Sequence, residues 1–127
     1  MTITRSGNLS PDTTVHRVGG GSVVNLRLKP IEEELSPPGI SVFLGGTPQA
    51  AAEQLRRAFP RSSKWRGRQV VGTTTVAAVR QVGFDIMPDP TVRFPNHARL
   101  IHPAGVVGFV ETNLENLSRV FQDTKGC

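Results

Sequence analysis

The sequence contains one cysteine, one tryptophan and no tyrosine among its 127 residues. The cysteine is Cys127, the last residue, so an internal disulfide is excluded and we expect this residue in a solvated tail. No apolar run approaches the ~18 residues of a membrane helix. The first residues do not show the basic segment followed by an apolar segment that is typical of a secretory signal peptide. We therefore expect a protein without membrane spans or a secretion signal, acting in the cytosol.

Several motifs of enzymes and binding proteins are missing. His97 and His102 lie five positions apart on a predicted strand, so they point to opposite faces and do not share a metal ion. A Ser-His-Asp hydrolase built from Ser41, His97 and Asp85 or Asp89 lacks the G-x-S-x-G elbow. No helix-turn-helix spacing and no aromatic string of the RNA-binding type occurs. We expect neither a metal site nor sequence-specific nucleic-acid binding.

Positive charge is concentrated in one region of the chain. The 15 basic residues exceed the 10 acidic ones, which gives a net charge of +5. Eight of the basic residues lie around Trp65: Arg56, Arg57, Arg61, Lys64, Arg66, Arg68, Arg80 and Arg93. Such a patch binds phosphates or an acidic protein. A solvated loop that keeps the protein soluble is the simpler explanation of the same residues.

Hydrophobic patterning predicts an α+β fold in a single domain over residues 15–127. Residues 1–14 are polar and without periodicity, so we expect a flexible N-terminal segment. The segments with β-branched or alternating patterns predict strands at 15–18, 22–28, 40–46, 70–72, 84–87 and 97–102. Thr47 and Pro48 predict the start of a helix over 48–58, and residues 61–69 read as a basic loop.

Two further helices are predicted from residues that are typical of helix ends. Thr73 or Thr74 is the expected cap of a helix that Gly83 terminates. Thr112 and Glu115 have the spacing of a capping box, which predicts a helix over 113–122.

The stretch from Phe84 to Pro103 is the strongest candidate for a functional site. Prolines at 88, 90 and 95 favour a rigid, extended connection that presents His97 at the start of a strand. Gly19, Gly20 and Gly21 follow the first predicted strand, and a backbone without Cβ atoms lets a ligand approach closely. A flexible hairpin turn explains these glycines equally well.

Four segments taken together resemble a known toxin family. They are VHRVGG at 15–20, PPGISVF at 37–43, FPNHARLIHPAG at 94–105 and the amphipathic helix near the C-terminus. In this order they are similar to the small bacterial type VI secretion effectors with an ADP-ribosyltransferase-like fold. The resemblance implies a split, bent pair of small antiparallel or mixed sheets with about three helices. It also implies a cleft that binds NAD.

The resemblance assigns roles to individual residues. Arg17 would reach the phosphates or ribose of NAD, Ser41 would brace the nicotinamide side, and His97 would orient a ribose hydroxyl or polarise the target. Glu111, with Glu115 as the weaker candidate, would stabilise the charge that develops as nicotinamide leaves. The expected cofactor-binding residues are Arg17, Gly19, Gly20, Gly21, Ser22, Ser41, Asn96 and His97. Ile40 departs from the family pattern, which has a threonine before the serine.

The implied function is transfer of ADP-ribose from NAD to an intracellular target, or consumption of NAD, by a bacterial toxin. An alternative is a non-catalytic module of the same fold that binds an acidic, immunity-type protein through its basic surface. Weak, non-specific nucleic-acid binding through that surface is a third interpretation.

Overall fold

A computed structural model describes residues 9–127, and residues 1–8 of the predicted flexible segment lie outside this range. The fold is α+β, as predicted. Its strands are β1 (Thr14–Val18), β2 (Gly39–Leu44), β3 (Val71–Thr75), β4 (Asp85–Pro88), β5 (His97–Ile101) and β6 (Gln122–Thr124). Its helices are α1 (Val23–Leu26), α2 (Pro30–Glu33), α3 (Pro48–Ala58), α4 (Ser63–Arg66), α5 (Val76–Gln81), η2 (Gly105–Phe109) and α6 (Glu111–Arg119).

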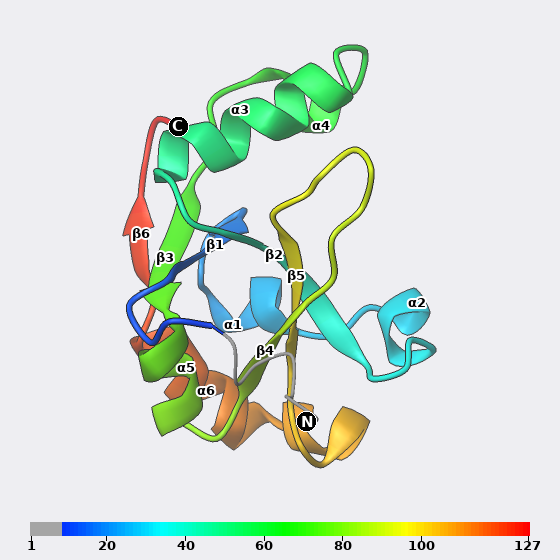
Figure 1. Cartoon of the computed structure of the whole chain (residues 1–127), viewed down its shortest axis with the longest axis vertical. Coiled ribbons are helices and arrows are strands. Elements are labelled where there is room, and N and C mark those ends of the chain that lie inside the picture. The colour runs from blue at the N-terminus through cyan, green and yellow to red at the C-terminus, as the bar shows by residue number, and fades with distance from the viewer. Residues whose placement is uncertain (1–8) are drawn as a thin grey trace.

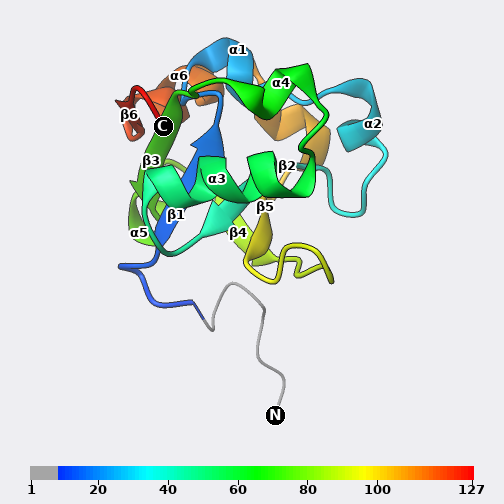
Figure 2. The same ribbon diagram turned by 90° about the horizontal axis from the view of Figure 1, so that it is seen from above.

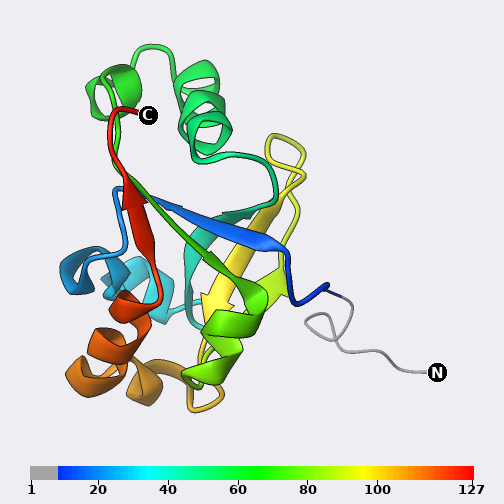
Figure 3. The ribbon, with the colours of Figure 1, turned by 90° about the vertical axis from the view of Figure 1, so that its left-hand side faces the viewer.

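The strands form one antiparallel sheet of six strands in the order β4-β5-β2-β1-β3-β6. Within this sheet, β1 pairs with β2 through only Val15↔Leu44 and His16↔Phe43. By contrast, β1 pairs with β3, and β2 with β5, over five residues each. Beyond His16 the two halves diverge, as the side view shows (Figure 3). The structure therefore has one sheet in place of the pair implied by the resemblance, and more helices than the three or so that it implied. The two halves of this sheet, β4-β5-β2 and β1-β3-β6, share a short seam.

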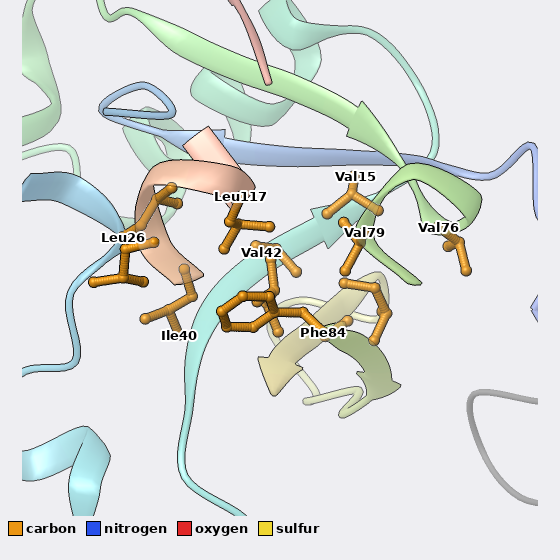
Figure 4. Packing of buried hydrophobic residues seen from close by; sticks show 12 residues of the cluster. Val15, Leu26, Ile40, Val42, Val76, Val79, Phe84 and Leu117 are labelled. Atoms are coloured by element: carbon orange, nitrogen blue, oxygen red, sulfur yellow. The ribbon is translucent and has the colours of Figure 1, made fainter. Parts of the chain in front are cut away.

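Alternating side chains place a hydrophobic core on each face of the sheet. On one face, strand residues such as Val15, Ile40 and Val42 pack with Leu114 and Leu117 of α6 (Figure 4). The other face carries a smaller cluster in which Val18, Phe43 and Val71 pack with residues of α3. The helices are correspondingly divided: α3 and α4 lie at one end of the molecule and α5 and α6 at the other (Figure 1). In the view from above, α3 crosses in front of the strands (Figure 2).

The helix over 48–58 is confirmed, with the hydroxyl of Thr47 accepting from the amide of Ala50. The cap of the next helix is Thr75 instead of Thr73 or Thr74, because β3 continues to Thr75. Gly83 follows this helix with φ +92°, a conformation that favours glycine. The helix is therefore confirmed, but it begins later than the predicted caps Thr73 and Thr74 indicate.

Residues 22–28 do not form the predicted strand. Gly19 and Gly20 have φ of 102° and 98°, which turns the chain sharply after β1. Ser22 then accepts from the amide of Asn25 and caps α1. Local capping therefore overrides the β-branched pattern. Likewise, the predicted loop at 61–69 contains the short helix α4.

The C-terminal part of the chain also differs from expectation. Helix α6 begins at Glu111 behind Val110, without a side-chain cap, so the Thr112–Glu115 capping box is not formed. The strand β6, which was not predicted, pairs with β3. Cys127 is only 5% exposed, and its amide donates to the carbonyl of Gln69 at 2.8 Å. The prediction of a solvated tail at Cys127 is therefore wrong.

The N-terminal end of the described chain is bonded to the domain. The carbonyl of Thr13 accepts from the amide of Val76, and that of Pro11 accepts from the amide of Ala77. These bonds satisfy two orphan amides at the start of α5. Among residues 9–127, no helix has the length and apolar character needed to cross a membrane.

Candidate functional site

The divergence of β1 from β2 opens a cavity of about 390 Å³ on the α3 side of the sheet. Its walls come from the end of β1, from α1 and α2, from β2 and β5, from α3 and α4, and from the β4–β5 loop. The residues that line it are Arg17, Val18, Gly19, Asn25, Lys29, Glu32, Ser41, Phe43, Leu55, Lys64, Trp65, Gln69, Thr91, Phe94 and His97. Segments far apart in the sequence thus meet at the seam between the half-sheets.

Arg17 lies where the half-sheets separate and is only 8% exposed. Its Nε and one terminal nitrogen donate to the carbonyl of Asn25, at 3.0 and 2.8 Å. The other terminal nitrogen donates to the carbonyl of Ser41 at 2.9 Å. The guanidinium therefore joins α1 to β2 across the gap. Backbone carbonyls hold it in place but do not neutralise its charge.

The charge of Arg17 has no carboxylate partner within ion-pair distance among residues 9–127. Burial lowers the pKa of Arg17, and the more distant Glu32 carboxylate partly opposes that effect. A guanidinium carries five N–H groups, of which three are used in the bonds to carbonyls. A buried cation of this kind is costly without a counter-charge, so the cavity favours an anionic ligand.

Ser41 and His97 are brought together on the same face of the sheet. Ser41 lies opposite Arg99, and Phe43 lies opposite His97, so Ser41 and His97 are diagonal neighbours on β2 and β5. The distance from Ser41 Oγ to His97 Nε2 is 3.0 Å. Ser41 is exposed to solvent through the cavity, as a reacting hydroxyl must be.

Asp89 defines the hydrogen-bonding state of His97. His97 Nδ1 lies 2.9 Å from the carbonyl oxygen of Asp89, which only accepts. In the neutral ring Nδ1 therefore carries the proton, and Nε2 accepts the hydroxyl proton of Ser41. The Asp89 carboxylate lies 3.5 Å from Nδ1 and 3.0 Å from Arg99. His97 is thus positioned as a proton acceptor at the cavity surface.

Aromatic rings form part of the cavity wall. Phe94 from the β4–β5 loop packs on Phe43, with centroids 5.3 Å apart, and Phe43 lies 5.9 Å from the ring of His97. Trp65 of α4 lines another part of the wall, with Lys64 Nζ 4.7 Å from its ring centroid. Rings and cations together suit a ligand that has both aromatic groups and negative charge.

The structure brings four of the predicted site residues into the cavity: Arg17, Gly19, Ser41 and His97. The others do not line it. The Asn96 amide bonds Gln54 and the carbonyl of Leu44, and Ser22 caps α1. Gly21 lies beneath Phe121, and Gly20 faces Asp123. These glycines serve close packing of the chain next to β3 and β6.

Glu111 lies on α6, where its carboxylate forms an exposed ion pair with Arg27 at 2.7 Å. It does not line the cavity. The carboxylate inside the cavity belongs to Glu32 of α2, whose Oε1 accepts from the amide of Lys29 at 2.8 Å. Nothing in the local sequence pattern around Glu32 indicates that its carboxylate lines a cavity, because that position depends on how α2 packs against β2. Trp65 was noted only as part of the basic region.

The sequence matches no family model, and it matches neither a curated protein nor a solved structure. The function must therefore be inferred from the residues of the cavity.

Proposed function

We propose that this chain is a bacterial toxin or effector domain, of the ADP-ribosyltransferase type found among type VI secretion effectors. NAD binds in the cavity at Arg17, and its ADP-ribose is transferred to an intracellular target or to water. The observation that carries the proposal is the buried Arg17 guanidinium, which lacks a carboxylate partner and faces a cavity with aromatic walls. The NAD pyrophosphate supplies the missing negative charge, and planar rings of the cavity accept its bases.

His97 is the proposed base of the transfer step. The bond between ribose C1′ and the nicotinamide nitrogen breaks, and its electron pair neutralises the positive charge of the nicotinamide ring. An acceptor oxygen bonds to C1′ and releases its proton to His97 Nε2, directly or through the Ser41 hydroxyl. The distance of 3.0 Å between Ser41 Oγ and His97 Nε2 suits such a relay.

We further assign to Glu32 the role that the resemblance suggested for Glu111. Positive charge develops on the ribose as nicotinamide leaves, and a nearby carboxylate stabilises it. Glu32 lines the cavity, while Glu111 is engaged by Arg27 on α6. The comparison of Glu32→Gln with Glu111→Gln tests this assignment: the first variant should lose activity and the second should keep it.

The second candidate is a non-catalytic module that binds an acidic, immunity-type protein. The observation that favours it is the stretch between Glu53 and Asp85, which contains no acidic residue and seven basic ones. In that case charge reversal at Arg66 and Arg68 weakens capture of the partner, and substitutions in the cavity have no effect.

Incubation of the protein with NAD and a bacterial lysate tests the leading proposal. Free nicotinamide and labelled ADP-ribose on macromolecules are both measured, because transfer gives both and hydrolysis gives only the first. His97→Ala and Ser41→Ala should abolish or strongly reduce both signals, and Glu111→Gln serves as the matched control. Absence of both signals from the folded protein would reject the enzymatic proposal in favour of the binding module.

A further inference from the structure

The segment from Arg56 to Arg68, here called the basic arm, carries cations that are not neutralised within the fold. Arg56 and Arg57 share the carboxylate of Glu53. Arg61, Lys64, Arg66 and Arg68 are exposed and form no ion pair among residues 9–127. The basic arm comprises the last turn of α3 and the whole of α4. It lies on the opposite side of the molecule from α6 (Figure 1). Its charge is therefore available to a polyanion.

A series of aromatic rings leads from the surface of the basic arm to the candidate site. Phe59, directly after α3, is 38% exposed, and its ring centroid lies 6.3 Å from that of Phe94. Phe94 contacts Phe43, which contacts the ring of His97. We call Phe59, Phe94, Phe43 and His97 the aromatic track. It connects an exposed ring to the proposed base of the reaction.

Cations lie directly over exposed or partly exposed rings in this region. The guanidinium carbon of Arg93 is 5.2 Å from the centroid of Phe59, and Lys64 Nζ is 4.7 Å from that of Trp65. A cation that covers a ring in the free protein can move to a phosphate while a base takes its place on the ring. Interleaved rings and cations are the arrangement by which proteins bind single strands without sequence preference.

We propose that the basic arm and the aromatic track bind single-stranded nucleic acid, DNA or RNA, without sequence specificity. Phosphates contact cations such as Arg61 and Arg66, and a base stacks on the exposed ring of Phe59. An acidic protein would use the cations, but it gives no reason for rings beside them. Duplex nucleic acid fits this surface less well than a single strand, because its bases are already stacked and cannot lie on these rings.

The inference rests on the proposed function in one respect. Because the track ends at His97, the bound strand is the acceptor of ADP-ribose. Binding of the strand does not itself depend on NAD, so it is measured separately from transfer. A strand that binds without being modified would reject its role as acceptor and leave the binding site established.

Fluorescence anisotropy of an end-labelled oligothymidylate and an oligouridylate, without NAD, tests the binding site. With about four phosphate contacts to a single strand, affinity should fall roughly 50-fold between 50 and 200 mM salt. Phe59→Ala should weaken binding roughly tenfold through lost stacking. Arg61→Ala should reduce the salt slope by about 0.7. The control is Arg119→Ala, which removes an exposed arginine of α6 whose guanidinium donates to Asn116 Oδ1.

Circular dichroism establishes that each variant is folded. If Phe59→Ala is not folded, Phe59→Leu replaces it, because leucine keeps an apolar side chain but has no ring for a base to stack on. Equal loss of affinity in the Arg119→Ala variant would overturn the proposal. So would competition by polyglutamate as effective as that by the unlabelled oligonucleotide, with no effect of Phe59→Ala, because that result identifies an acidic protein as the partner. Preference for the duplex over the single strand would also overturn it.

Discussion

Ser41 Oγ lies 3.0 Å from His97 Nε2, although the two residues are 56 positions apart in the sequence. They are diagonal neighbours on adjacent antiparallel strands, with Phe43 directly opposite His97. The opposite ring nitrogen of His97 is occupied by the backbone carbonyl of Asp89, which no side-chain substitution removes. Sheet register and backbone hydrogen bonding thus define both partners of His97. This rigidity is what a proton acceptor in a reaction requires.

The first prediction concerns this pair. His97→Ala should reduce nicotinamide release by roughly 10²- to 10⁴-fold, the usual contribution of a general base. Ser41→Ala should also reduce nicotinamide release, but it should not change thermal stability. The Ser41 side chain is exposed in the cavity, and the backbone carbonyl of residue 41 still accepts from Arg17. Steady-state kinetics and thermal melts are the measurements. Full activity in both variants would contradict the assigned roles.

The second prediction concerns the anion-binding role of Arg17. Arg17→Lys keeps the charge but loses the fork that bonds Asn25 and Ser41, so NAD affinity should fall roughly tenfold or more. Trp65 is the only tryptophan of the chain and lines the same cavity, so its emission reports binding directly.

The control for this titration is Arg27→Lys, which alters an exposed arginine outside the cavity. Nicotinamide mononucleotide, which lacks the pyrophosphate, should bind more weakly than NAD to the wild type. It should also be less sensitive to Arg17→Lys. Equal losses for both ligands would show that Arg17 does not bind the pyrophosphate.

The sequence was most informative where a structure is determined by neighbouring residues. The helix over 48–58 was predicted correctly because Thr47, Pro48 and a run of alanines all favour it locally. The failures at residues 22–28 and at Thr112 have a different origin. There, the turn at Gly19 and Gly20 and the packing of α6 decide the structure, and neither is visible in local periodicity.

The candidate site likewise combines residues that can be recognised in the sequence with contacts that depend on the tertiary structure. Ser41 and His97 were selected individually from the sequence, but their contact depends on the register of β2 and β5. Glu32 could not be recognised, because its place in the cavity depends on how α2 packs against the half-sheets. Arg17 was selected through the resemblance alone, because its local pattern is that of an ordinary strand residue. Only the divergence of β1 from β2 reveals that its charge is buried without a partner.

The third prediction concerns stability against pH. His16 is fully buried, with Nδ1 2.9 Å from the hydroxyl of Thr73 and Nε2 3.0 Å from the carbonyl of Gly46. Burial lowers the pKa of His16 below its ordinary value of 6.5, although hydrogen bonds to the carbonyls of Gly46 and Gly45 partly oppose this. Below pH 6.5, His16 is therefore protonated in the unfolded chain more readily than in the folded protein. The free energy of unfolding falls as a result.

Stability contributed by neutral His16 is thus present above pH 6.5 and lost as the pH falls toward the folded-state pKa. Urea unfolding at pH 7.5, 6.5 and 5.5 measures this effect, with His16→Gln as the comparison. The variant should be less stable at pH 7.5 and should lose less stability on acidification. Parallel pH dependences of the two proteins would show that His16 is not responsible.

The fourth prediction concerns Thr74, a buried residue of β3. Its hydroxyl oxygen is inaccessible to solvent and has no hydrogen-bond partner among residues 9–127. A buried hydroxyl without a partner costs free energy that a methyl group of the same size does not. Thr74→Val should therefore stabilise the protein by about 1 kcal/mol, and valine also favours a strand. For a chain of this size the melting temperature should rise by about 4 °C.

Thr73→Val is the matched control on the same strand, because the Thr73 hydroxyl bonds His16. It should lower the melting temperature, since it removes one partner of a buried pair. Opposite shifts for two identical substitutions at adjacent positions would establish that the hydrogen bond decides the sign. Destabilisation by Thr74→Val as large as that by Thr73→Val would show that the Thr74 hydroxyl is satisfied in solution.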